Sequence, residues 1–174
     1  FEVRNLTRAG MFNNVSFKLY KGEILGVAGL IGAGRTEVMR AAFGADPYDS
    51  GECLMDGKPY KAKTPKDTIK KGLGLIPEDR RGQGLLLEKN VKENTSLASL
   101  FANSNHGFIN FGWEKQESVS YIEKLRIKTP SELALLKNLS GGNQQKVVIA
   151  KWLLAKSRIL IMDEPTRGID VNAK

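Results

Sequence analysis

The sequence is poor in residues that mark several classes of protein. Among 174 residues it has one cysteine, Cys53, so no disulfide can form within the chain, and we expect a reducing, cytoplasmic setting. No apolar run approaches the roughly 18 residues that span a bilayer. The first residues alternate like a strand and do not resemble a signal peptide. These absences leave a globular domain with a core of its own.

The charge is basic but not concentrated. Lys and Arg number 27 against 19 Asp and Glu, which gives a formal net charge of +8. No basic tract is interleaved with aromatic residues, so we expect no nucleic acid as a partner. The scattered charge is typical of a solvated basic surface, which would also favour an anionic nucleotide ligand.

The order of the expected strands indicates an α/β fold. Residues 1–6 and 15–20 alternate apolar with polar side chains, and Asp56-Gly57 predicts a tight hairpin turn, so the N-terminal part is expected to be antiparallel. Three short runs predict further strands, of which the first is expected to be buried on both faces, as in a parallel sheet, and the last to be buried. These runs are residues 24–28, 73–76 and 158–162.

Helical patterns separate these strands and fill a long insertion. Residues 35–43 and 141–156 predict helices that flank the sheet. The segment 88–137 is expected to be mostly helical, and a loop is expected at 78–88. Further helices are predicted from Pro65 to about 72, from 90 or 92 to about 101, at 113–125 and at 130–136. The fold class is therefore a P-loop NTPase-like, mainly parallel sheet flanked by helices, with an N-terminal antiparallel part and a helical insertion.

A glycine-rich turn, GLIGAGRT, follows the first apolar run and opens a helix. Glycines allow backbone N–H groups to converge on phosphate oxygens, and a helix N-terminus favours anions. The alternative is a tight turn with no ligand, and this motif alone leaves it open. The residues expected to bind phosphate are Gly29, Gly32, Ala33, Gly34, Arg35 and Thr36.

Two side chains of this turn have distinct expected roles. The Thr36 hydroxyl is placed to coordinate Mg²⁺. Arg35 stands where phosphate loops usually have lysine, and its planar guanidinium is not equivalent to an ammonium. Phosphate binding can survive this exchange while the geometry of the transition state suffers.

An acidic pair follows the last apolar run. Because ligands lie at the carboxyl ends of strands in open α/β sheets, Asp163 is placed to hold Mg²⁺ through its water shell. Glu164 is placed to orient or deprotonate an attacking water. An acidic pair at a strand end is common by itself, and the phosphate loop upstream is what favours catalysis.

The segment LSGGNQQ supplies a second candidate anion site. Ser140 can cap the helix that follows, and Gly141 and Gly142 permit close approach of a ligand to the backbone. Each glycine in a helix costs up to about 1 kcal/mol relative to alanine, which indicates that something else requires them. The bland alternative is an ordinary serine-capped helix.

With these motifs the chain resembles the ATP-binding cassette (ABC) family over nearly its whole length. LSGGNQQ resembles the signature motif, RILIMDEP resembles Walker B with a catalytic glutamate, and RGID occupies the D-loop position. The resemblance implies that two cassettes pack head to tail around ATP. It assigns Ser140, Gly141, Gly142 and Gln144 to nucleotide binding.

Within that family the chain is similar to the second, C-terminal cassette of ribose, galactose and xylose importers. The segments GLIGAGRTE, IPEDRRGQGL, VKENTSL and DEPTRGIDV carry this similarity. Glu78 stands where most cassettes have the Q-loop glutamine, and we assign it to catalysis beside Glu164. The only histidine, His106, is expected in a loop, and the strand with the family's switch histidine is expected beyond residue 174.

The resemblance also implies the setting of the protein. We expect one nucleotide-binding domain with an ATP-binding core at 1–87 and 138–174 and a helical subdomain at 88–137. Its cofactors would be ATP and Mg²⁺. Its partners would be a second cassette, transmembrane permease subunits and, indirectly, a periplasmic or extracellular sugar-binding protein, at the cytoplasmic face of the membrane.

Several functions remain open at this point. The first is an ATPase that drives monosaccharide import. The second is a degenerate half that binds nucleotide and completes the partner's site, which Arg35 and Glu78 favour. A nucleoside importer is a closer competitor than a non-transport ABC ATPase, and the GAGR segment favours sugars.

Overall fold

The computed structural model describes residues 1–30, 32–62, 64–104 and 107–167. The chain divides into two compact units, Phe1–Lys71 and Gly72–Lys174, and each is described by itself. His106 and residues 168–170 of the expected D-loop lie outside the described residues.

The first unit contains the expected antiparallel sheet. Its strands are β1 (Glu2–Arg8), β2 (Phe12–Lys18), β3 (Ser50–Met55) and β4 (Lys58–Tyr60), in the order β2-β1-β3-β4. All three pairings are antiparallel, and β3 pairs with β4 across the predicted Asp56-Gly57 turn. Both turn residues have positive φ, which is the backbone conformation that a primed hairpin turn requires.

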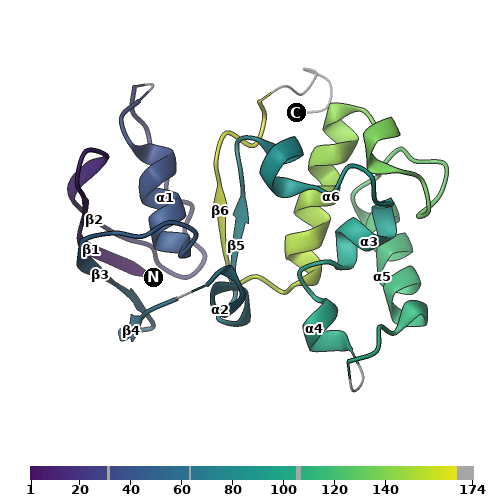
Figure 1. Ribbon diagram of the computed structural model, residues 1–174, viewed down its shortest axis with the longest axis horizontal. Coiled ribbons are helices and arrows are strands. Elements are labelled where there is room, and N and C mark those ends of the chain that lie inside the picture. The colour runs from purple at the N-terminus through teal and green to yellow at the C-terminus, as the bar shows by residue number, and fades with distance from the viewer. Residues whose placement is uncertain (31, 63, 105–106, 168–174) are drawn as a thin grey trace. The chain divides into compact units, whose positions relative to one another are not determined.

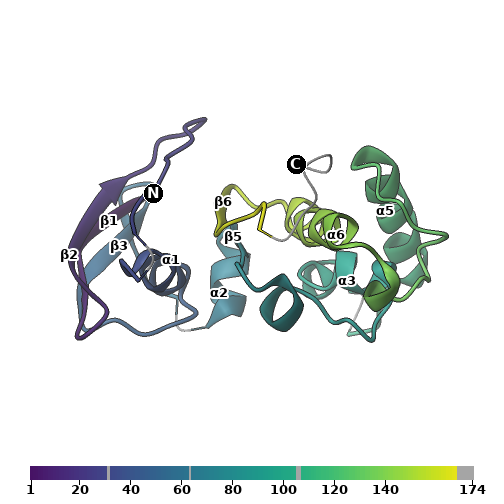
Figure 2. The ribbon, with the colours of Figure 1, turned by 90° about the horizontal axis from the view of Figure 1, so that it is seen from above.

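Helix α1 (Arg35–Phe43) begins and ends at the predicted residues and lies on one face of this sheet (Figure 2). Helix α2 (Pro65–Lys70) is capped by Thr64, whose side chain accepts from Asp67 N–H. Cys53 lies in the core with 2% of its surface exposed, and burial raises the pKa of its thiol to about 11. The buried side chains of this core include Val3, Leu6, Phe12, Val38, Phe43, Cys53, Leu54 and Tyr60.

The prediction of a buried strand at 24–28 is wrong. The described residues of this segment form no strand, and Ile24 is 98% exposed. The pattern predicts burial, but a strand also needs backbone partners on its edges. The four strands of the sheet in its own unit pair with one another, in the order β2-β1-β3-β4, and not with residues 24–28.

The second unit holds the parallel strands β5 (Leu73–Ile76) and β6 (Ile159–Met162), side by side in Figure 1. Every residue of β5 is buried, as expected for a strand in a parallel pair. Strand β6 is only partly buried, and Met162 is 49% exposed, so the prediction of full burial is wrong for this strand. The predicted loop after β5 contains the π-helical turn η1 (Arg80–Gly84).

In the described residues of this unit, four α-helices accompany these strands. They are α3 (Val91–Ser96), α4 (Leu100–Asn103), α5 (Phe111–Lys124) and α6 (Gly141–Leu154), and α3 packs against both α5 and α6 (Figure 1). The predicted single helix from 90 to about 101 is two helices. The Thr95 and Ser96 hydroxyls donate back to the carbonyls of Val91 and Glu93, a contact that often bends helices near its position.

The helix predicted at 130–136 is also wrong. A short 3₁₀ turn, η2, begins only at Leu136 and ends at Asn138. Before it, the carbonyls of Glu132 and Ala134 accept from the N–H groups of Lys92 and Val91, at the start of α3. These contacts satisfy N–H groups in the first turn of α3, and they engage carbonyls that a helix at 130–136 would use for its own hydrogen bonds.

No helix in the described part of the chain is both long and apolar enough to cross a membrane.

Candidate functional site

The phosphate-loop candidates lie in the first unit, at the start of α1. Gly34 is the N-cap residue, with a left-handed φ of 80°, and it is buried. A Cβ at this position would lie 2.8 Å from the carbonyl oxygen of Met11, closer than real side chains approach backbone. Gly32 also has φ of 80°, but nothing lies within 4 Å of its Cβ position. The backbone at this helix entry therefore requires glycine for two separate reasons.

The side chains that follow occupy the first turn of α1. Arg35 and Thr36 are half-buried, and Gly29 and Ala33 are exposed. The N-cap glycine offers no side-chain acceptor to the first turn, whose N–H groups have no acceptor within a helix. An anion held by these N–H groups would complete the helix terminus.

In the second unit, acidic residues follow two paired parallel strands. Strand β5 pairs with β6 so that Ile76 lies opposite Met162, and Asp163 N–H continues the ladder by donating to Ile76 O at 2.9 Å. Glu78 and Glu164 each come two residues after that last strand pair. The structure thus places Glu78 at the same edge of the sheet as Asp163 and Glu164, whose position at a strand's carboxyl end the sequence predicts.

The backbone at Glu164 is unusual. Its φ is 43°, in the left-handed region that costs a residue with a side chain roughly 1–2 kcal/mol. Arg167 N–H donates to Glu164 O at 3.0 Å, which closes a turn directly after β6. Strained residues of this kind cluster at functional sites, because surrounding structure must hold them. Glu164 is exposed, and Asp163 is half-buried.

The signature segment begins α6. Ser140 is the N-cap residue, but its side chain makes no capping bond to the backbone, so that part of the prediction is wrong. Its hydroxyl instead accepts from Asn143 Nδ2 at 2.9 Å. Ser140 is exposed, and Gly141 and Gly142 are half-buried in the first turn. The serine hydroxyl and the glycine backbone therefore lie at the surface of the unit.

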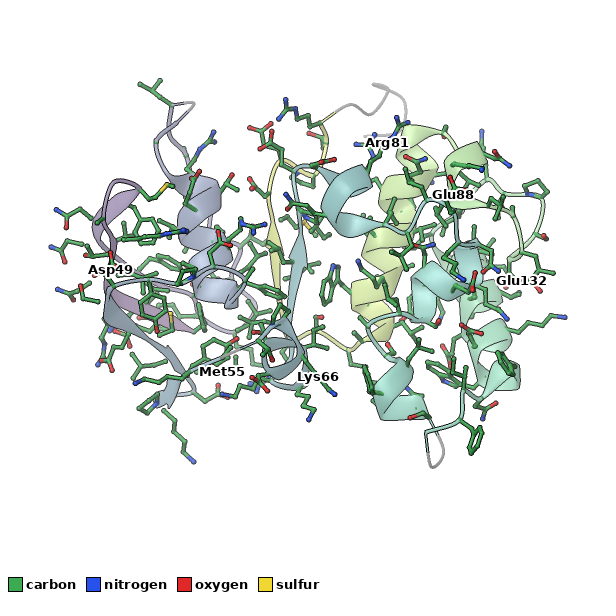
Figure 3. All side chains as sticks on the ribbon, viewed as in Figure 1. Asp49, Met55, Lys66, Arg81, Glu88 and Glu132 are labelled. Atoms are coloured by element: carbon green, nitrogen blue, oxygen red, sulfur yellow. The ribbon has the colours of Figure 1, made fainter. Side chains whose placement is uncertain are left out.

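Gln144 is almost fully buried, with 1% of its surface exposed, and its side chain is engaged on both sides. Its Nε2 donates to Leu136 O at 3.0 Å, and its Oε1 accepts from Arg81 Nε at 3.3 Å. Figure 3 shows Arg81 beside the N-terminal end of α6. Gln144 thus joins the signature helix to the turn η1.

Lys151 makes a second connection between the same two elements. Its Nζ donates to Gly84 O at 2.7 Å, and the side chain is 7% exposed. Burial removes water from this ammonium and lowers its pKa to about 8. The Trp152 ring lies 5.1 Å from Nζ. Turn η1 is therefore fixed to α6 at two points.

A family model described as "ABC transporter" matches residues 12–167. The chain belongs to the ABC transporter family. This match covers the phosphate loop, the signature segment and the acidic pair, which are the motifs on which the resemblance rests.

Curated relatives of this cassette are named for sugar import. The ribose import ATP-binding protein RbsA of Oceanobacillus iheyensis is 53% identical over 99% of this chain. A putative ribose/galactose/methyl galactoside import ATP-binding protein of Rhizobium etli is 51% identical over 99% of the chain. The chain covers 35% and 33% of these two relatives, and so spans about a third of their length.

Solved structures share the fold. A dimeric structure of the ATP-binding cassette MJ0796 bound to ADP and Pi matches 99% of this chain with a TM-score of 0.82 at 20% identity. This chain covers 77% of that one. A nucleotide-free ATP-binding cassette matches with a TM-score of 0.78. The predicted fold class, α/β with an antiparallel β part, is confirmed.

The candidate residues of the cassette fall into three groups. The phosphate loop and Thr36 lie in the first unit, whereas the acidic edge and the signature helix lie in the second. Within the second unit, η1 connects the last two groups. The sequence did not indicate roles for Arg81 and Lys151, and it indicated Arg167 only as part of the RGID segment. Lys151 had a signal, since it is four residues after Val147 and so lies on the apolar face of α6.

Proposed function

We propose that this chain is the C-terminal cassette of a two-cassette protein. It binds Mg-ATP and hydrolyses it to drive the import of a monosaccharide. The sugar assignment rests on relatives named for ribose and galactose import. The catalytic assignment rests chiefly on Glu164, held in a left-handed conformation directly after the β6 strand and Asp163. ATP and Mg²⁺ are the expected cofactors. The proposal includes an ATP-binding core made of residues 1–87 and 138–174, and a helical subdomain made of residues 88–137.

The residues of the phosphate loop and of the signature segment fit a nucleoside triphosphate. A Cβ would close the space at Gly34, and this N-cap glycine makes no side-chain bond to α1, so the helix N-terminus would suit phosphate oxygens. Gly29, Gly32, Ala33 and Arg35 would complete that cradle. Ser140, Gly141 and Gly142 would contact the nucleotide held by the opposing cassette, while buried Gln144 would support them through its contacts with Leu136 and Arg81.

The metal expectation is also chemically consistent. Mg²⁺ keeps several waters and takes one or two protein oxygens beside phosphates. Thr36 and Asp163 would supply such oxygens. Bound Mg²⁺ would neutralise charge developing on the phosphates. Glu164, with Glu78 nearby at the strand ends, would orient a water and accept its proton.

The partners follow from the same proposal. The solved relative MJ0796 is a dimer, which supports a head-to-tail pair of cassettes here. Permease subunits and, indirectly, a sugar-binding protein outside the membrane would complete the importer at its cytoplasmic face. The names of the relatives support this assembly.

The test compares Glu164→Gln with Glu88→Gln in the full-length protein. Glu88 is an exposed glutamate paired with Lys137, so its substitution controls for the loss of one carboxylate. We expect Glu164→Gln to slow phosphate release by about 100-fold or more while ATP binding persists. Equal turnover of the two variants would reject the catalytic role of Glu164.

A degenerate half-site is the second candidate, and Arg35 favours it. Under that function the chain would hold nucleotide and lend its signature helix to the partner's site. Arg35→Lys would then change turnover little, whereas Ser140→Arg would abolish it. The reverse ranking would favour hydrolysis at this chain's own phosphate loop.

A further inference from the structure

An ion pair joins the segment after β5 to the segment after β6. The guanidinium of Arg167 contacts the Glu78 carboxylate, with side chains that are 61% and 36% exposed. Arg80 Nη1 donates to Arg167 O at 2.8 Å. The short segment from Glu78 to Arg80 therefore holds both the side chain and the backbone of Arg167. All of these contacts lie within the second unit.

The position of this pair matters because acidic residues gather there. Glu78, Asp79, Asp163 and Glu164 all follow the paired ends of β5 and β6. Asp79 is engaged in capping η1, where its carboxylate accepts from Gly82 N–H at 3.0 Å. Like charges at one edge repel each other, and they repel an anionic nucleotide as well. A cation placed on one of them reduces that repulsion.

We propose that Arg167 is a positioning residue that neutralises Glu78 and holds its carboxylate against the turn after β6. It thereby sets the charge that the phosphates of a bound nucleotide meet at this edge. The inference rests on the proposed function, since it concerns the same site. Glu78 adds a negative charge to the acidic edge, and its ion pair with Arg167 offsets that charge.

If Arg167 acts by neutralising Glu78, then removing Glu78 should reverse the effect of removing Arg167. Arg167→Ala leaves Glu78 uncompensated, so nucleotide affinity should fall about five-fold. Glu78→Gln added to that variant removes the exposed charge, so the double variant should return to within about two-fold of the wild type. Arg167→Lys keeps the charge and should stay near the wild type. The bond from Arg80 Nη1 ends on the backbone oxygen of Arg167, so none of these substitutions removes either of its atoms.

The experiment titrates a fluorescent ATP analogue with Mg²⁺ into full-length protein at about 50 mM and about 300 mM salt. Lys137→Ala is the matched control, because it also removes one cation from an exposed ion pair, with Glu88 at 2.7 Å. We expect that control to bind within about two-fold of the wild type. The loss in Arg167→Ala should shrink at the higher salt, because screening weakens a charge effect and leaves a structural one unchanged.

The outcomes separate the two proposals. A wild type that does not bind the analogue rejects the proposed function, and this inference with it. A wild type that binds, with Arg167→Ala no weaker than Lys137→Ala, rejects the inference alone. A double variant as weak as Arg167→Ala also rejects it, since the role of Arg167 would then not act through Glu78.

Discussion

The two glycine-containing helix starts are prepared in different ways. Helix α1 begins at Gly34, whose left-handed backbone packs against the carbonyl of Met11. Helix α6 follows the N-cap residue Ser140, which is extended, and two buried side chains of the helix, Gln144 and Lys151, fix it to η1. The first arrangement depends on having no side chain, and the second depends on particular polar atoms. Substitutions should therefore damage the two starts by different mechanisms.

The largest effect is expected at Gly34. Gly34→Ala combines a left-handed residue with a Cβ that would lie 2.8 Å from Met11 O, and we expect a loss of about 3–4 kcal/mol in unfolding free energy. Gly32→Ala has the same φ but open space, so it should cost only about 1–2 kcal/mol. Urea unfolding of both variants measures the difference. Equal losses would show that the close contact contributes nothing.

Lys151 should make stability depend on pH. Its pKa is about 8 in the folded chain and near the usual 10.5 when unfolded. Below pH 8 both states carry the proton. Between pH 8 and 10.5 the unfolded state binds more protons, so the unfolding free energy rises with pH. From pH 7 to 10 the wild type should gain about 2–3 kcal/mol relative to Lys151→Met, measured by urea unfolding.

A flat difference between those two proteins would show that the ammonium is not buried as described. Lys151→Arg is the useful companion, because it keeps a donor for Gly84 O but titrates far above this range. Its stability relative to Lys151→Met should not change between pH 7 and 10.

Gln144→Ala should cost about 2 kcal/mol, because it removes one of the two donors to the Leu136 carbonyl, which keeps Leu139 N–H, and opens a small cavity. Arg81 would lose its contact as well. The backbone at the start of α6 should keep its conformation, unlike that of α1 in Gly34→Ala. Thermal unfolding gives the stability change. A loss below about 0.5 kcal/mol would remove Gln144 as an anchor of this helix.

The smallest effect is expected for Lys137→Ala. Lys137 and Glu88 form an ion pair with a distance of 2.7 Å, but their side chains are 46% and 76% exposed. Exposed pairs contribute about 0–1 kcal/mol, so we expect a loss below about 0.5 kcal/mol by the same thermal measurement. A larger loss would mean that surface charge, as well as buried contacts, holds this unit together.

Local patterns in the sequence were sufficient for much of the fold. Helix α1 and strand β5 have their predicted bounds, because Gly34, Gly44 and Pro77 mark their ends. The helix prediction for 130–136 was wrong because carbonyls of this segment accept hydrogen bonds from the start of α3. A local pattern does not contain that long-range contact. The strand prediction for 24–28 was wrong because an apolar pattern does not determine which strand will pair with it.

The candidate site shows the same limit. Asp163 and Glu164 were predictable because a polar pair after an apolar strand marks the strand's carboxyl end. Arg167 was read only as part of a motif, and its contact with Glu78 joins residues far apart in the chain. Gln144 was assigned to a ligand, and its burial against Leu136 and Arg81 depends on packing between elements.

The burial of Cys53 gives the chain a built-in reporter of local opening. Because it is the only cysteine, a thiol-specific reagent has a single target. Its 2% exposure and a pKa of about 11 keep the folded thiol unreactive near neutral pH. The rate of labelling therefore measures how often strand β3 opens enough to expose Cys53. Thiol labelling would report the opening rate of the first unit, and amide hydrogen exchange would report the opening of the second.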